Sequence, residues 1–434
     1  MHKQIILLAF LSFLSVCANA NYYAYIPDNT GLDQGQTHAD RIFVFNTRDH
    51  VIVNTIPTFG RPRDVAISPD GSTVYFSTID KPDQPNNSYI NILNTHTLEN
   101  PRPIRVTDQT NVRGMAISQD NTTLYVTHAN GVTRIKAPLV TDEQATIQTL
   151  YRGKTLILSD DGKYLFVLGQ DDAFNFGVSV VATDTFTEVK DYAIGQNTDS
   201  NAIIYHNTLQ KLFIANQATN EVVSLQLNNY DDENNVTLTE INRVQFPDKY
   251  GPTAFTLIEA TNELYVAVSM SGYTFEDTST ANSPLKEGYV ALLDARDINH
   301  TVKEIALSDE ESTYTDIVNI HPVSLGKTPT GAVFLLKQLW GDRAGLYISW
   351  LRKTISGNNV YFSEINSTLI GKTVTIYSNG NFIGPDCTAC PTGVDDTVAR
   401  NRSAALNPHL FLFFAIVALL RIYYSKNETY RARS

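Results

Sequence analysis

Apolar and polar residues alternate in short runs along most of this chain. Segments 64–78, 114–128 and 155–169 each contain an apolar run, a short polar turn and a second run that opens on an apolar–aromatic pair. More divergent copies follow at 202–216 and 255–269. The turns of the first three copies are Asp-Gly or Asp-Asn, residues that tolerate the positive φ of a tight hairpin. The pattern therefore predicts a repeated β-hairpin.

The aromatic residue of the second run marks the length of the repeat. These marker residues are Tyr25, Tyr75, Tyr125, Phe166, Phe213, Tyr265 and Tyr347. Their successive spacings are 50, 50, 41, 47, 52 and 82 residues. Two more short β-rich runs lie between neighbouring markers, so each repeat contains four predicted strands. Four strands in about 40 to 50 residues is the pattern of a β-propeller blade. The last gap holds either one blade with a large insertion or two blades.

These observations predict an all-β protein with a single β-propeller of four-stranded blades over residues 21–386. We find no run of about 10 to 12 residues with helical periodicity there, which excludes a helical solenoid. At about 50 residues per blade the segment accommodates seven blades, with six and eight as alternatives. The chain opens, at 22–27, on what reads as the second strand of a blade. A C-terminal strand should therefore complete that blade, and the candidates are Val360–Ile365 and Thr373–Tyr377.

The stretch from Tyr22 to Thr78 resembles the YVTN-type β-propeller repeat family. The resemblance rests on YIPDN, on RIFVFNTRDHVIVNTIPTFGRP and on RDVAISPDGSTVYFST, and it weakens along a region of about residues 21–350. It implies the propeller fold. Some propellers similar to this family open lactones, and related ones bind quinone-modified partners or metals in electron transfer, so the resemblance does not single out one function.

Composition limits the classes of function. The 434 residues carry 45 acidic and 33 basic side chains, which gives a formal net charge of −12. This acidic balance argues against nucleic acid as a partner, because phosphate backbones require a basic surface. With 42% hydrophobic residues the chain can bury a large core, which excludes disorder for most of its length.

Residues 1–20 have the pattern of a secretory signal peptide. Lys3 provides a positive start, an apolar core follows, and Ala-Asn-Ala at 18–20 provides a small-residue cleavage site. A transmembrane anchor is one alternative, but the apolar core is short for a span of about 20 residues. A lipoprotein signal at Cys17 is another, and the bulk of Val16 disfavours it. We therefore expect an extracytoplasmic protein, located in the periplasm or at the cell surface.

The C-terminal region divides into a spacer at 387–409, an apolar segment at 410–424 and a basic tail at 425–434. We expect the apolar segment to form a short hydrophobic helix that attaches the protein to a membrane, either retained or removed during sorting. The order of spacer, apolar helix and basic end is similar to the sorting tails of bacterial surface proteins. An amphipathic helix docked on the propeller is the alternative.

The spacer contains the only two cysteines that remain after signal cleavage, Cys387 and Cys390, which are candidates for a disulfide in an oxidising compartment. A c-type haem is disfavoured because Pro391 stands where the required His would be. A zinc site would need two further ligands, and none lies nearby in the sequence.

Four basic residues form the main candidate site. Arg63, Arg113 and Lys154 occupy one position of the repeat, at the start of three successive innermost strands, and Arg152 precedes Lys154 by two residues. Because innermost strands line the central channel, these cations should lie at one channel mouth and could hold a carboxylate or phosphate group. The alternative is local pairing, for instance of Arg63 with Asp64, or plain solvation.

Two polar insertions, one acidic stretch and the histidines give weaker indications of a functional site. The polar insertions Ser271–Glu287 and Ser308–Ile320 should be loops, where binding residues often reside, although simple solvated loops fit as well. The acidic stretch 231–233 lacks the spacing of a calcium loop and favours a solvated turn. We expect no metal site, because His206, His300, His321 and His409 are scattered and show no metal-ligand spacing, and we expect no cofactor. His128 follows Val126 and Thr127 at a strand end, where a rim or channel position is possible, but a single histidine there is more often structural.

The sequence assigns no catalytic residue, since it has no serine-hydrolase elbow, phosphate-binding glycine loop or zinc-protease motif. Propeller enzymes take catalytic residues from different blades, so this weakens the enzyme hypothesis without removing it. The favoured interpretation is an exported, membrane- or surface-attached, monomeric propeller that binds a protein or a small anionic ligand as a binding or scaffolding module. A lactonase-like enzyme or electron-transfer partner, and a surface-structural or adhesive protein, are the alternatives.

Overall fold

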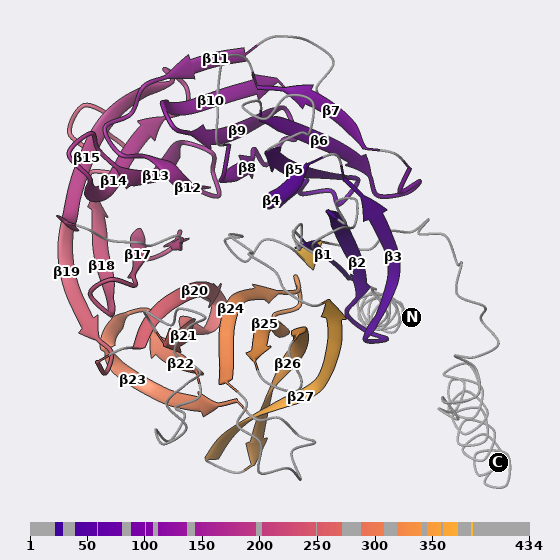
Figure 1. Cartoon of the computed structure of the whole chain (residues 1–434). Helices are drawn as coiled ribbons and strands as arrows, with labels where there is room; N and C mark the ends of the chain where they lie inside the picture. The colour runs from indigo at the N-terminus through magenta and orange to yellow at the C-terminus, as the bar shows by residue number, and fades with distance from the viewer. Residues whose placement is uncertain are drawn as a thin grey trace, which may run out of the picture. The chain divides into compact units, whose positions relative to one another are not determined.

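The chain divides into two compact units, residues 1–390 and 391–434. The computed structural model describes residues 22–28, 40–58, 60–79, 88–99, 101–106, 112–136, 144–196, 202–248, 250–270, 288–307, 319–340, 345–356, 359–371 and 383–384. All of them belong to the first unit, which is a β-propeller of seven four-stranded antiparallel blades around a central axis (Figure 1). The all-β fold and the number of blades predicted from the sequence are both confirmed.

Six blades consist of consecutive strands, numbered from the axis outward. Blade 2 contains β4 (Arg61–Ile67), β5 (Thr73–Ile79), β6 (Tyr89–Asn94) and β7 (Arg102–Arg105). Blade 3 contains β8 (Met115–Ile117), β9 (Thr123–His128), β10 (Gly131–Lys136) and β11 (Gln144–Ile147). Blade 4 contains β12 (Arg152–Leu158), β13 (Tyr164–Gln170), β14 (Asn175–Ala182) and β15 (Thr187–Gln196).

Blades 5 to 7 repeat this order. Blade 5 contains β16 (Ile203–His206), β17 (Lys211–Asn216), β18 (Glu221–Asn228) and β19 (Thr237–Gln245). Blade 6 contains β20 (Tyr250–Ile258), the short 3-10 turn η1 (Glu259–Thr261), β21 (Glu263–Met270), β22 (Tyr289–Asp294) and β23 (Asp297–Ala306). Blade 7 contains β24 (Asn319–Lys327), β25 (Val333–Trp340), β26 (Gly345–Ser356) and β27 (Asn359–Gly371).

Blade 1 joins the two ends of the propeller sequence. Its strands are β28 (Ile383–Gly384), β1 (Tyr23–Asp28), β2 (Arg41–Asn46) and β3 (Val51–Pro57). β28 and β1 are antiparallel, with Tyr23 opposite Gly384 and Ala24 opposite Ile383. The prediction that a C-terminal strand completes the first blade is therefore confirmed.

The position of that closing strand was predicted wrongly. Val360–Ile365 belongs to β27, the outermost strand of blade 7, and Thr373–Tyr377 lies outside the described residues. The error has a physical reason, because alternating apolar residues indicate a strand with one buried face in either an innermost or an outermost position. The two-residue strand that closes the ring is too short to produce such an alternation.

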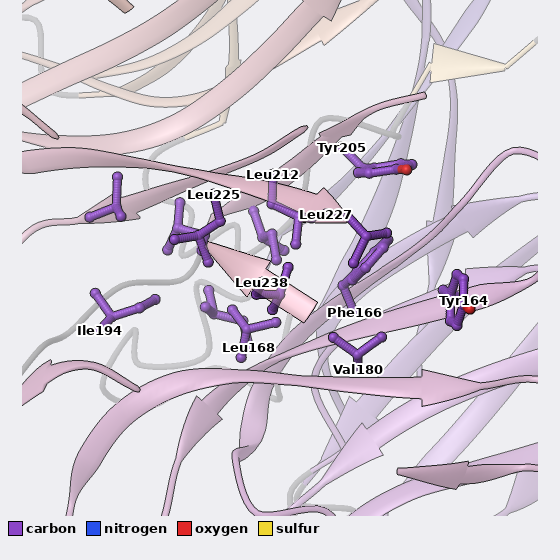
Figure 2. Packing of buried hydrophobic residues seen from close by; sticks show 14 of the residues in the cluster. Tyr164, Phe166, Leu168, Val180, Ile194, Tyr205, Leu212, Leu225, Leu227 and Leu238 are labelled. Atoms are coloured by element: carbon purple, nitrogen blue, oxygen red, sulfur yellow. The ribbon is translucent and has the colours of Figure 1, made fainter. Parts of the chain in front are cut away.

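The hydrophobic core is divided among the joints between neighbouring blades. Seven clusters of buried hydrophobic residues occur in the described part, and each draws on two adjacent blades, with blade 7 packing on blade 1. Figure 2 shows the joint of blades 4 and 5, where the rings of Phe166 and Tyr205 lie 4.8 Å apart. Leu165 and Val167, on the other side of β13, pack against blade 3. Each blade therefore buries both faces, as the period-two alternation of its strands requires.

The repeated hairpin turn has the same hydrogen bonds in several blades. In blade 2 the Ser68 hydroxyl donates to the Asp70 carboxylate (2.6 Å) and accepts the Thr73 N–H (2.9 Å). Ser118 and Ser159 make the equivalent bonds in blades 3 and 4. In blades 2 to 7 one residue of this turn has a positive φ, and these residues are Gly71, Asn121, Gly162, Gln210, Asn262 and Gly331.

The same turn identifies the last copy of the repeat, whose marker residue was predicted at the wrong position. Thr328 stands where Ser68 stands in blade 2, and its hydroxyl accepts the N–H of Ala332 (3.0 Å). The marker of this last copy is Phe334 in β25, whereas Tyr347 lies in the next strand, β26. The long gap after blade 6 therefore holds one blade and not two. The misplacement arose because threonine residues replace both the serine and the aspartate of the turn.

Candidate functional site

The four predicted cations belong to segments on one face of the ring. We call it the entry face, defined by the first residues of the innermost strands β4, β8, β12, β16, β20 and β24 (Figure 1). Because neighbouring strands are antiparallel, the turn between the second and third strands of a blade lies on the same face. The two polar insertions join β21 to β22 and β23 to β24 at this face. Residues 271–287 and 308–318 themselves lie outside the described residues, and Asn319 and Ile320 already belong to β24.

Three of the predicted cations lie at the start of the innermost strands of three successive blades. Arg63 is in β4, Arg113 lies two residues before β8, and Lys154 is in β12. The pairing register is interrupted at Arg63 and at Lys154, which marks a β-bulge in each strand. A bulge re-aims the side chains of its strand and is often found beside functional sites. The shared repeat position is therefore a bulge position in blades 2 and 4.

Arg152, the fourth predicted cation, has several local partners. Its Nε donates to the carbonyl oxygen of Ala129 (3.0 Å) and its Nη1 to that of Thr149 (3.3 Å). Its Nη2 pairs with the carboxylate of Asp172, in the turn between β13 and β14. Ala129 lies in the corresponding turn of blade 3. Arg152 therefore ties together the entry-face turns of blades 3 and 4.

A buried carboxyl group lies next to Arg63 in the chain. Asp64 is only 2% exposed, its Oδ2 accepts the N–H of Met115 in blade 3 (2.9 Å), and its Oδ1 has no hydrogen-bond partner among the described residues. Burial raises the pKa of Asp64 to about 8, although backbone hydrogen bonds from Met115 and Val65 oppose this shift. The carboxyl group is therefore mainly uncharged at neutral pH.

Asp64 was named in the sequence analysis only as a local partner for Arg63. Its burial and its contact with blade 3 depend on the packing of two blades, which periodicity does not report. The available signal was its repeat position, which holds Gly114 in blade 3 and Thr155 in blade 4. A carboxyl group at a position otherwise taken by small, uncharged residues marks the site as unusual.

His128 is a buried histidine in the entry-face turn of blade 3. Its Nδ1 accepts the N–H of Asn130 (3.2 Å), so the proton sits on Nε2, which donates to the Thr133 hydroxyl (3.0 Å). Burial lowers its pKa to about 4. The ring is therefore neutral at physiological pH and stabilises the turn, in agreement with the structural role expected for a single histidine.

The opposite face contains a chain of polar contacts across blades 4 to 6. The N–H of Asp160 donates to the side-chain oxygen of Asn207 (2.8 Å). Asn207 in turn donates from its backbone and side chain to the Glu259 carboxylate (3.1 and 3.0 Å). His206 Nε2 contacts the side-chain oxygen of Asn262 (2.9 Å). These residues follow the innermost strands and connect neighbouring blades.

A groove of about 780 Å³ separates blades 3 and 4 on this opposite face. Its lining carries charges of both signs, with Arg134 and Lys136 from β10 and Asp120, Asp161 and Asp184 from three turns. The Arg134 guanidinium lies over the ring of Phe186, 4.6 Å from its centre. The mixture of charges does not select one class of ligand.

The acidic stretch 231–233 forms a turn that packs on blade 4. Asp232 accepts hydrogen bonds from the Asn234 N–H (3.1 Å) and from the Asn235 side chain (2.6 Å), and these bonds lower its pKa. The preceding Tyr230 donates its hydroxyl to Asp161 in blade 4 (2.6 Å). Asp231 and Asp232 are exposed, as expected for the solvated turn that the sequence favoured, and Tyr230 connects this turn to blade 4.

The remaining candidates do not come together. Among the described residues, no group of three or more His, Cys, Asp or Glu side chains could hold a metal ion. His128, His206 and His300 belong to blades 3, 5 and 6, and His321 lies in β24. Cys387, Cys390 and His409 lie outside the described residues, as do the N-terminal segment 1–20 and the C-terminal segment 410–424.

Comparison with known proteins assigns the fold. No known protein family and no curated protein sequence matches this chain. Among solved structures, a periplasmic gluconolactonase of Pseudomonas aeruginosa has 13% identity and a TM-score of 0.53, covering 81% of this chain and 97% of that one. A Bacteroides uniformis protein whose name refers to 6-phosphogluconolactonase has 14% identity and a TM-score of 0.52, covering 84% and 99%.

Hydrazine synthase of Kuenenia stuttgartiensis is also similar, with 15% identity and a TM-score of 0.51 over 70% of this chain and 90% of that one. These likenesses agree with the β-propeller fold of the described residues. At such identities they establish the fold alone, because this fold carries many different functions. The YVTN-type repeat family itself is not matched. No helix within the described ranges is long and apolar enough to cross a membrane.

Proposed function

We propose that this chain is an exported β-propeller that binds a small anion at the entry face of blades 2 to 4. The observation that carries this proposal is the recurrence of Arg63, Arg113 and Lys154 at one repeat position in three successive blades. Cations in such an arc favour a carboxylate or phosphate group through charge-assisted hydrogen bonds. The protonated state of Asp64 supports the proposal, because an ionised carboxylate beside Arg63 would weaken the attraction for an anion.

Isothermal titration calorimetry of the purified protein with inorganic phosphate and with citrate tests the proposal. We expect saturable binding that weakens at least about tenfold in the combined variant Arg63→Gln, Arg113→Gln and Lys154→Gln, since each charge-assisted bond contributes about 1.5–3 kcal/mol. The matched control changes Arg102, Arg105 and Lys190 to Gln; these cations lie on the outermost strands β7 and β15. Equal binding by the two variants would refute the site. The absence of saturable binding to the native protein would favour a structural or adhesive role.

Export and surface attachment are part of the same proposal. They rest on the signal-like segment 1–20, on the apolar segment 410–424 and on the periplasmic location given in the name of one similar propeller. Fractionation of native cells combined with intact mass tests both. A membrane-bound protein that starts at Asn21 and keeps Ser434 would indicate a retained anchor. A chain that ends before residue 410 would indicate processing, and a cytoplasmic chain that keeps Met1 would contradict export.

A lactone-opening enzyme is the second candidate, favoured by the gluconolactonases among the similar propellers. Proton release from glucono-δ-lactone above the uncatalysed rate would support it. Loss of that rate in the combined Arg63, Arg113 and Lys154 variant would place the reaction at the same face, whereas an unchanged rate would place it elsewhere.

A further inference from the structure

The turn between β13 and β14 presents an aromatic side chain on the entry face. Phe174 is 67% exposed, more than any other large hydrophobic residue in the described ranges. The turn that carries it is well ordered by Asp171, whose carboxylate accepts the N–H groups of Ala173 (2.9 Å) and Asn175 (2.8 Å). The Phe174 N–H donates to the Asp171 carbonyl (3.1 Å). The phenyl ring is therefore held in an exposed position by the turn itself.

The backbone of Phe174 makes this exposure unusual. Its φ is 62°, in the left-handed region that bulky residues avoid. Two other large apolar residues share this conformation, Leu98 and Phe186, and both are buried, at 7% and 5% exposure. Burial of their side chains offsets the backbone strain, whereas the Phe174 ring is exposed and its backbone is held by the hydrogen bonds of the Asp171 turn. Residues held by their surroundings in sparsely populated backbone conformations are concentrated at functional sites.

Phe174 lies on the same face of the ring as the proposed anion site, which consists of Arg63, Arg113 and Lys154. Asp172, two residues earlier in the same turn, pairs with Arg152. Arg152 begins β12, and Lys154 follows two residues later in the same strand. Phe174 and Lys154 therefore belong to the same blade, and both lie toward its entry face.

We propose that the anion bound at the entry face carries an apolar, ring-sized group that packs on Phe174. This inference rests on the proposed function and specifies the class of its ligand. A small molecule fits the observations better than a protein partner, because one exposed ring offers far less than the roughly 800 Å² that a stable protein interface buries on each side. Apolar contact with the ring would supply binding energy that inorganic anions cannot obtain.

Competition between two matched probes tests this inference. Phenylphosphate and inorganic phosphate carry the same anionic group, and only the first has a ring. We expect the native protein to bind phenylphosphate about threefold to tenfold more tightly, as one aromatic contact allows. Phe174→Asn should abolish this preference and leave the affinity for inorganic phosphate unchanged. The same variant should raise the melting temperature, because Asn tolerates the left-handed backbone.

The control is Tyr361→Asn, which removes an exposed aromatic ring from the outermost strand β27 and should keep the preference. If the native protein bound both probes equally, or if Phe174→Asn kept the preference for phenylphosphate, the inference would be refuted. Binding of inorganic phosphate would in that case still support the anion site at Arg63, Arg113 and Lys154. If neither probe bound, both the proposed anion site at the entry face and this inference would be refuted. Similar losses in the Phe174 and Tyr361 variants would show that the ring acts through non-specific apolar contact, which also contradicts it.

Discussion

At the scale of single residues, two buried titratable groups near the entry face, Asp64 and His128, respond to pH in opposite directions. Asp64 keeps its proton in the folded protein up to pH about 8, whereas an aspartate in an unfolded chain releases it near pH 4. The folded state therefore binds more protons than the unfolded state between these values. The contribution of Asp64 to stability consequently falls as the pH rises through this window and is constant above it.

We predict that Asp64→Asn reduces this loss of stability at rising pH. Asparagine keeps an oxygen that can accept the Met115 N–H, but it cannot ionise. The slope that it removes amounts to at most about 1.4 kcal/mol per pH unit. Chemical denaturation of both proteins from pH 5 to pH 9 measures it. Parallel stability curves for the two proteins would contradict the assignment.

His128 has the reverse dependence. Its folded pKa of about 4 lies below the ordinary value of 6.5, so the unfolded state binds more protons between these values and stability falls as the pH decreases from 6.5 to 4. Protonation would also place a hydrogen on Nδ1, which now accepts the Asn130 N–H. We predict that His128→Gln is less stable than the native protein at pH 7 but loses less stability on acidification. Melting temperatures at pH 7, 5.5 and 4.5 provide the comparison, and an identical acid response would refute the prediction.

At the scale of elements, turns as well as strands make contacts between neighbouring blades. The turn between β18 and β19 reaches from blade 5 to blade 4, where Tyr230 donates to Asp161 and the Tyr164 hydroxyl donates to the Tyr230 carbonyl (2.9 Å). Lys163 also donates to this carbonyl (2.8 Å). The turn that carries the exposed acidic run is therefore connected to the neighbouring blade through Tyr230.

We predict that Tyr230→Phe destabilises the propeller by about 1 kcal/mol, because it keeps the ring but removes one hydrogen bond to a charged acceptor, and solvent exposure weakens that bond. Tyr361→Phe on β27 is the control and should have almost no effect, since that residue is exposed. The free energy of unfolding by urea is the measurement. Equal stability of both variants would mean that the contact between the turn and blade 4 contributes nothing.

At the scale of the whole molecule, the ring depends on a very short strand. β28 contributes two residues to blade 1, and the buried joint between blades 1 and 7 lies next to it. In a closed ring each blade is supported on both sides, so loss of the closing strand should affect the first and last blades together.

We predict that a chain ending at Asn381 melts at a lower temperature and aggregates more readily than a chain ending at Cys390. The shorter chain lacks β28 and leaves the inner edge of β1 without its partner, and an unpaired edge promotes association. Differential scanning calorimetry and light scattering of both chains provide the test. Equal melting temperatures would show that the ring closes through side-chain packing alone.

Much of the architecture follows from local sequence. Alternating apolar residues specify strands with buried faces, and the Ser-x-Asp turns around Ser68, Ser118 and Ser159 hold their hairpins by contacts within a few residues. Four strands per repeat and seven repeats then determine a seven-bladed ring. The repeat position of Arg63, Arg113 and Lys154 was likewise visible, because repeats place equivalent residues on the same face.

Other features were decided only by the tertiary structure. The closing strand is two residues long, and its place depends on the inner edge of β1, some 360 residues earlier in the chain. Asp64 and Phe174 each differ from the pattern of their surroundings, but burial between two blades makes Asp64 neutral and a turn held by Asp171 exposes Phe174. Such environments arise from contacts between blades and from backbone geometry, which the order of apolar and polar residues does not encode.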